Sequence, residues 1–223
     1  MQKKFNTPIA NWSCCLLLLL GACQPQAGKD SRVETLPFFQ EATFTPQWLE
    51  PDDAALDTFH RIADFALYNQ QGQTITGADF QGKIYVANFF FTICPGICPK
   101  MTQNMHRLQE EFLEDEGVLL VSHSVTPEMD SVPVLQAYAQ RNEISARTWH
   151  LLTGERQDIY HLGRQVYFIE EDLGLERDPD EFLHTENFVL VDQRGYIRGI
   201  YNGLNKGSVE QLMGDIYTLK REG

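Results

Sequence analysis

The chain has 223 residues, of which 43% are apolar and 22% are charged, and 14 Phe and 8 Tyr are available to fill a core. This composition is typical of a globular protein of about one domain and excludes a wholly disordered chain. The formal net charge of −13 offers no basic surface to neutralise phosphates, so nucleic acid is excluded as an expected partner.

The first residues have the pattern of an export signal. Lys3 and Lys4 precede a compact apolar stretch at residues 14–22, which is shorter than the roughly 20 apolar residues that span a bilayer. The stretch ends in Leu-Gly-Ala before Cys23, as in a bacterial lipoprotein signal. We therefore expect removal of residues 1–22, lipid on Cys23, and a domain in the bacterial cell envelope that faces the periplasm. An ordinary signal peptide with an incidental Cys is the alternative.

Residues 23–55 are predicted to be a lipid-anchored tether and irregular segment, of which residues 24–41 are polar, and residues 56–223 to be the folded domain. In chain order, the patterns predict a hairpin (63–68 and 73–76), a buried strand (83–91), a helix (99–114), a second buried strand (118–125), two helices (132–141 and 156–166), a second hairpin (187–191 and 196–201) and an amphipathic helix (208–220). This order indicates an α/β, thioredoxin-like fold with a mixed central sheet flanked by helices.

Cys94 and Cys98 carry the clearest chemical signal. If Cys14 and Cys15 are cleaved off and Cys23 carries lipid, these two are the remaining cysteines. Each precedes a proline, which disfavours helical backbone, so we expect both in a loop before a helix whose free N–H groups favour thiolates. Thioredoxin-type reductases separate their cysteines by two residues, and the three residues here favour two thiolates on one soft ion, Cu(I) above all. A catalytic zinc ion, a structural disulfide and inert thiols are the alternatives.

A histidine is the expected third ligand. His184 lies just before the predicted strand 187–191, and in thioredoxin-like folds that loop faces the Cys pair. His106 lies two helical turns beyond Cys98, and His123 falls in a buried strand pattern that indicates a core residue, although it is the next candidate. Three others, His60, His150 and His161, have no argument that brings them near. Met101 and Met105 follow an apolar helix stripe and are expected in the core.

Several motifs together resemble the Sco/SenC family over residues 60–220. They are VANFFFTICPGICPKM (residues 86–101), SVTPEMD (124–130) with Tyr138 downstream, WHLLTG (149–154) and His184-Thr185 before a strand. The resemblance implies a thioredoxin fold that binds one copper ion, Cu(I) or Cu(II), through Cys94, Cys98 and His184. It also implies delivery of copper to the dinuclear site of cytochrome c oxidase, so the expected partner is its copper-bearing subunit or another copper protein.

The resemblance has three departures and leaves a second function open. Gly96, Thr126 and Leu183 stand where the family usually has Asp, so the carboxylate that would orient His184 is not identified. The same Cys pair could instead make the chain an enzyme, a thiol–disulfide reductase that keeps the acceptor's cysteines reduced. His184 separates the two functions, because a metal site needs its imidazole and dithiol exchange does not. A copper sensor and a peroxide-reducing protein are further alternatives.

Overall fold

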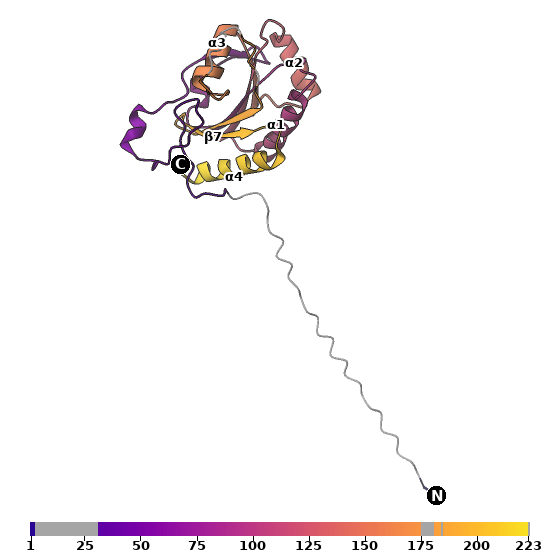
Figure 1. Cartoon of the computed structure of the whole chain (residues 1–223). Coiled ribbons are helices and arrows are strands. Elements are labelled where there is room, and N and C mark those ends of the chain that lie inside the picture. The colour runs from indigo at the N-terminus through magenta and orange to yellow at the C-terminus, as the bar shows by residue number, and fades with distance from the viewer. Residues whose placement is uncertain (3–30, 175–180, 184, 223) are drawn as a thin grey trace.

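The protein is described by a computed structural model that covers residues 1–2, 31–174, 181–183 and 185–222 (Figure 1). Within these residues one sheet has the strand order β2-β1-β5-β4-β3-β6-β7. Its strands are β1 (Ala66–Asn69), β2 (Thr74–Thr76), β3 (Ile84–Phe90), β4 (Val118–Ser124), β5 (Trp149–Thr153), β6 (Asn187–Val191) and β7 (Ile197–Asn202). Strands β3, β4 and β5 run parallel and the other pairings are antiparallel, which confirms the mixed sheet.

The central strands are covered on both faces by helices. Every residue of β3 is buried, as its near-continuous apolar run predicts. The helices are α1 (Cys98–Phe112), α2 (Val132–Arg141), α3 (Arg156–His161), which continues as the π-helical turn η3 (Leu162–Val166), and α4 (Lys206–Glu222). Two short helices, η1 (Ala54–Thr58) and η2 (Gly77–Phe80), lie in connections. No helix of the described residues is long and apolar enough to cross a membrane.

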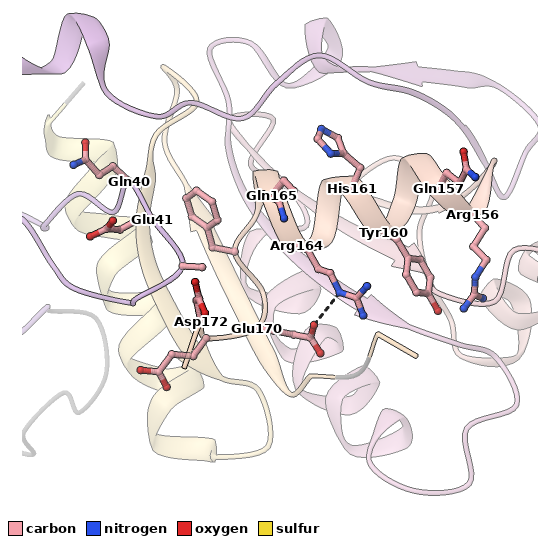
Figure 2. Close-up of a pocket in the computed structure, with 13 residues that line it drawn as sticks. Gln40, Glu41, Arg156, Gln157, Tyr160, His161, Arg164, Gln165, Glu170 and Asp172 are labelled. Carbon is pink, nitrogen blue, oxygen red and sulfur yellow. Dashed lines mark hydrogen bonds and ion pairs between the residues drawn. The ribbon is translucent and has the colours of Figure 1, made fainter. Parts of the chain in front are cut away.

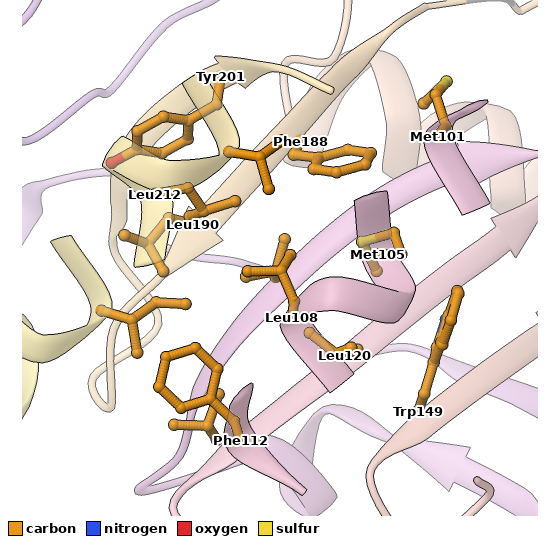
Figure 3. Close-up of a cluster of buried hydrophobic side chains, with 14 of the residues drawn as sticks. Met101, Met105, Leu108, Phe112, Leu120, Trp149, Phe188, Leu190, Tyr201 and Leu212 are labelled. Atoms are coloured by element: carbon orange, nitrogen blue, oxygen red, sulfur yellow. The ribbon is translucent and has the colours of Figure 1, made fainter. Parts of the chain in front are cut away.

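Each face of the sheet has its own hydrophobic core. Apolar side chains of α1, α2 and α4 pack on one face, and those of α3 and η3 pack on the other. Figure 3 shows the first core, where α1 inserts Met101, Met105, Leu108 and Phe112 between the sheet and α4. Met101 and Met105 are fully buried, which confirms their expected role in packing.

Three local predictions differ from the structure. The sequence patterns predict no strand over residues 149–153, whereas the structure forms β5 there by pairing with β4 and β1. The helix expected over residues 156–166 changes to π-helical geometry at Leu162. The N-terminal segment packs on the domain from Leu36 onward: Phe38 is fully buried and Phe39 pairs with Ile197. Residues 36–41 are therefore part of the packed domain and not a free tether.

One edge of the sheet gathers the segments that matter for chemistry. The carboxyl ends of the parallel strands β3 and β4 lie there, followed by the cysteine loop (residues 91–97) and the β4–α2 loop (residues 125–131). Strand β6 runs antiparallel to β3, with Ala87 opposite Val189. The residues just before β6 therefore lie at the same edge as those just after β3.

Candidate metal centre

The cysteine loop leads directly into α1. Cys94 is half-buried in the loop, and Cys98 is buried as the first residue of the helix. The expectation that both cysteines lie outside a helix is therefore wrong for Cys98. Pro99 fits the first turn, where its missing N–H costs nothing, and the N–H groups of Lys100 and Met101 close that turn on the Ile97 carbonyl. Both thiols are free.

The two thiols differ in their electrostatics. Partial burial alone would raise the pKa of Cys94, but hydrogen bonds from the Cys98 thiol and from the backbone N–H groups of Cys98, Gly96 and Ile97 lower it below its ordinary value of 9.0. Deeper burial, together with the Cys94 thiol, raises the pKa of Cys98 to about 12. The predicted low-pKa dithiol is therefore one activated sulfur, Cys94, beside a protonated one.

The β4–α2 loop is bonded to the cysteine loop. Val125 N–H donates to the Phe90 carbonyl at 2.9 Å, and the carboxylate of Asp130 accepts hydrogen bonds from both the backbone and the hydroxyl of Thr92. Thr92 lies two residues before Cys94. These contacts hold the start of the cysteine loop against the end of β4.

The segment before β6 meets the cysteine loop through aromatic side chains. The ring of Phe182 packs edge-to-face on that of Phe91, with centroids 5.4 Å apart. Next to it, Leu183 is fully buried, and its N–H reaches the hydroxyl of Tyr160, which itself donates to the Val125 carbonyl. On the other side of position 184, the buried Thr185 donates to the Ile169 carbonyl.

Of the predicted ligands, the structure brings together Cys94 and Cys98, whose thiols lie close enough to shift each other's pKa. His184 lies outside the described residues, as does the predicted lipidation site Cys23. Within the described ranges no three His, Cys, Asp or Glu side chains are grouped as a metal site.

The other histidines have their own surroundings. His123 is fully buried and stacks on Phe89 at 4.8 Å, which confirms the prediction of a core residue. Burial lowers its pKa from 6.5 to about 3. His106 on α1 pairs with Glu110, and His60 contacts the Val166 carbonyl.

An open groove of about 730 Å³ runs along the outer side of α3 and η3, between residues 40–42 and 170–172 (Figure 2). Arg164 points across it to form an ion pair with Glu170 at 3.3 Å and also donates to the Glu181 carbonyl. Among the described residues that line this groove, neither Cys94 nor Cys98 is found. Its residues Tyr160 and Arg164 matter to the site by supporting the segment before β6.

Sequence reasoning missed Thr92, Tyr160, Arg164 and Phe182 as residues that arrange the site. Their contacts join positions far apart in the chain: 38 residues separate Thr92 from Asp130, and 23 separate Tyr160 from Leu183. Two local signals exist: Thr92 lies in the first motif, and Asp130, which is fully buried, lies in the second.

Comparison with known proteins identifies the family. A model described as SCO1/SenC matches residues 53–220. The chain belongs to the SCO1/SenC family. Among curated relatives of this family, the SCO1 protein homolog of Bacillus subtilis (strain 168) is 28% identical over 161 residues, which are 70% of this chain and 81% of the relative.

Solved structures of the SCO1/SenC family confirm the thioredoxin-like fold. A SCO1/SenC family lipoprotein from Bacillus anthracis str. Ames is 32% identical with a TM-score of 0.63, covering 72% of this chain and 95% of that chain. BsSco, described as a member of the Sco family of cytochrome c oxidase assembly proteins with a disulfide switch, is 27% identical with a TM-score of 0.61, covering 73% and 94%. Arabidopsis thaliana ScoI with copper bound shares the fold at 23% identity and a TM-score of 0.57, covering 73% and 99%.

Proposed function

We propose that the chain binds one copper ion through Cys94, Cys98 and His184 and delivers it to the dinuclear copper site of cytochrome c oxidase. The observation that carries the proposal is the pair of free, neighbouring thiols beside the segment that leads to His184. Phe91 and Phe182 make that connection, since they lie three residues before Cys94 and two residues before His184.

The donor set fits copper. Thiolates are soft ligands that select Cu(I), which accepts two or three donors, and an imidazole also suits Cu(II). Cys94 has a lowered pKa and is partly exposed, so it offers the first bond to an incoming ion. Cys98 must lose its proton as the ion binds, so copper affinity falls as the pH falls.

Two relatives support this function. Arabidopsis ScoI has been solved with copper bound, and BsSco is described as belonging to the cytochrome c oxidase assembly proteins. On this basis we propose the copper-bearing subunit of the oxidase, or another copper protein, as the acceptor.

A thiol–disulfide reductase is the second candidate, and the unequal thiols favour it. The Cys94 thiolate would attack a disulfide of the acceptor, forming a mixed disulfide and releasing one acceptor thiolate. Cys98, once deprotonated, would then attack the Cys94 sulfur, releasing the second acceptor thiolate and leaving a Cys94–Cys98 disulfide. The acceptor gains two electrons and the pair loses two. The disulfide switch described for BsSco is consistent with such a reaction.

The variant His184→Ala separates the two functions. Cu(I) can remain on two thiolates, so its affinity should fall modestly, whereas the Cu(II) complex should weaken far more and lose its sulfur-to-copper charge-transfer absorbance. Reduction of a generic disulfide should be unchanged. His106→Ala is the matched control, because His106 is paired with Glu110 on α1 and should affect neither activity. An unchanged Cu(II) spectrum in His184→Ala would remove His184 from the site.

We also propose that residues 1–22 are a signal peptide and that lipid on Cys23 holds the domain at a membrane of the bacterial cell envelope, facing the periplasm. The Bacillus anthracis relative is described as a lipoprotein, which supports this. Residues between Cys23 and Leu36, where packing on the domain begins, would then form the tether. Cys23→Ala should abolish labelling by a radioactive fatty acid. Normal labelling of that variant would contradict the proposal.

A further inference from the structure

Asp130 is a buried carboxylate at the chemical edge of the sheet. It is fully buried, and within the described residues no Lys, Arg or His forms an ion pair with it. A buried charge is costly unless hydrogen bonds replace its hydration. Its position in the β4–α2 loop therefore needs a reason beyond packing.

Four hydrogen bonds supply that replacement, and all of them come from donors at the ends of β3 and β4. One carboxylate oxygen accepts from the Thr92 hydroxyl at 2.5 Å. The other accepts from the Thr92 N–H at 3.2 Å, the Ser124 hydroxyl at 2.6 Å and the Thr126 hydroxyl at 3.1 Å. A carboxylate is an acceptor with about four lone-pair sites, so this set of donors matches its capacity.

Thr92 is the residue through which this arrangement reaches the cysteines. It is the only one of the three donor residues in the cysteine loop, and it is held by both its backbone and its side chain. The backbone direction at residue 92 sets where the chain continues to Cys94. Hydrogen bonds to a charged acceptor are stronger than those between neutral groups, so the carboxylate fixes that direction more firmly than an amide would.

We propose that Asp130 is the positioning residue for the Cys pair. Through Thr92 it holds the cysteine loop in the geometry in which both sulfurs can bind the same copper ion or react in turn with the same acceptor disulfide. The inference deepens the proposed function, since it concerns the same two thiols. Within the described residues Asp130 has no hydrogen bond to either sulfur, and Thr92 is its one donor residue in the cysteine loop. Losing it should loosen the loop without removing a ligand.

The test compares matched variants of the whole protein by amide hydrogen exchange in the reduced, metal-free state and by the rate of copper release to a competing chelator. In Asp130→Asn and Thr92→Val, exchange in the peptide over residues 91–98 should accelerate about tenfold or more. Copper release should accelerate by a similar factor. Thr92→Ser keeps the hydroxyl and should stay within about twofold of the wild type.

Asp215→Asn is the control for merely losing a buried carboxylate. Asp215 is 5% exposed, and its partners Tyr201 and Gln211 lie in β7 and α4. This variant should lose stability without changing exchange in residues 91–98. The double variant Asp130→Asn with Thr92→Val should add little to either single one, because both remove the same interaction.

Wild-type exchange of residues 91–98 in Thr92→Val overturns the proposal, as does an acceleration in Asp130→Asn that is equal across the whole sheet. If Asp130→Asn does not fold, the comparison of Thr92→Val with Thr92→Ser still decides. The exchange measurement needs no copper, so it tests the role of Asp130 even if the wild-type protein binds no copper. A wild-type protein that binds no copper would contradict the proposed function and not the role of Asp130.

Discussion

Replacing each cysteine in turn should expose a large difference in reactivity between Cys94 and Cys98. Cys98→Ser leaves the thiol whose pKa is lowered by three backbone N–H groups, and a serine hydroxyl can still donate to it. Cys94→Ser leaves the thiol whose pKa is raised chiefly by burial, which the variant keeps. In the wild type the Cys94 thiol adds to this effect and the pKa is about 12, so the variant's thiol has a raised but lower pKa. Since the thiolate is the species that reacts, Cys98→Ser should be alkylated quickly and Cys94→Ser slowly.

The wild-type pKa of Cys98 sets an upper limit on how slowly the Cys98 thiol reacts. At pH 7 a thiol with the ordinary pKa of 9.0 is about 1% thiolate, and one with a pKa of about 12 is about a thousandfold less ionised. The more basic thiolate is intrinsically about twentyfold more nucleophilic, which leaves it about fiftyfold slower than an ordinary thiol. Loss of the Cys94 thiol lowers the pKa of Cys98 in Cys94→Ser, so this factor is a maximum for that variant. Because Cys94 should be faster than an ordinary thiol, Cys98→Ser should still react at least about tenfold faster than Cys94→Ser.

The assay is the rate of iodoacetamide alkylation of each reduced variant between pH 6 and pH 10, followed by mass spectrometry. The rate for Cys94→Ser should still be rising at pH 10, whereas the rate for Cys98→Ser should reach half of its plateau below pH 9. Equal rates at pH 7, or a plateau for Cys94→Ser below pH 9, would refute the assignment of Cys94 as the activated sulfur.

Three further predictions concern stability. Arg198 is buried and forms ion pairs with Asp192 and Glu222. It also donates to the carbonyls of Leu36 and Pro37 and covers the Phe38 ring. Arg198→Met should therefore lower the free energy of unfolding in urea by about 3–5 kcal/mol, and wild-type stability of this variant would contradict a structural role for Arg198. Folding lowers the pKa of His123 from 6.5 to about 3, so between these pH values the unfolded chain binds a proton that the folded chain does not. The stability present above pH 6.5 is therefore lost as the pH falls towards 3. In His123→Leu the urea midpoint should depend less on pH over that range, and an unchanged pH dependence would refute this. A Cβ at Gly163 would lie 2.7 Å from the Leu183 side chain and 3.1 Å from that of Phe89. Gly163→Ala should therefore lower the free energy of unfolding by about 1–3 kcal/mol and weaken Cu(II) binding by displacing Leu183. Normal Cu(II) affinity in a destabilised variant would mean that Leu183 does not position His184.

Much of the fold could be predicted because its signals are local. Three local signals each specify an element within a few residues: the near-continuous apolar run of β3, the helical spacing of Met101, Met105 and Leu108, and the turn between β1 and β2. Strand β5 and the N-terminal segment could not be predicted in this way. Phe38 belongs to a short apolar run (residues 36–39) within a polar segment, and only the fold shows that Arg198, 160 positions away, covers its ring.

The candidate site divides in the same manner. The Cys pair and its loop are visible in the sequence, because proline and cysteine spacing are local features. The difference between the two thiols is not, since it depends on which sulfur faces the core that α1 forms with the sheet. The same holds for the links through Thr92 and Tyr160, which join residues that only the sheet topology brings together.

Titration of the reduced, metal-free protein with copper under anaerobic conditions tests the central claim most directly. We predict one Cu(I) per chain in the wild type, loss of that site in Cys94→Ser and in Cys98→Ser, and one Cu(II) with thiolate charge-transfer absorbance that His184→Ala loses. Absence of copper binding by the reduced wild-type protein would contradict the claim and leave the reductase as the remaining function of the Cys pair.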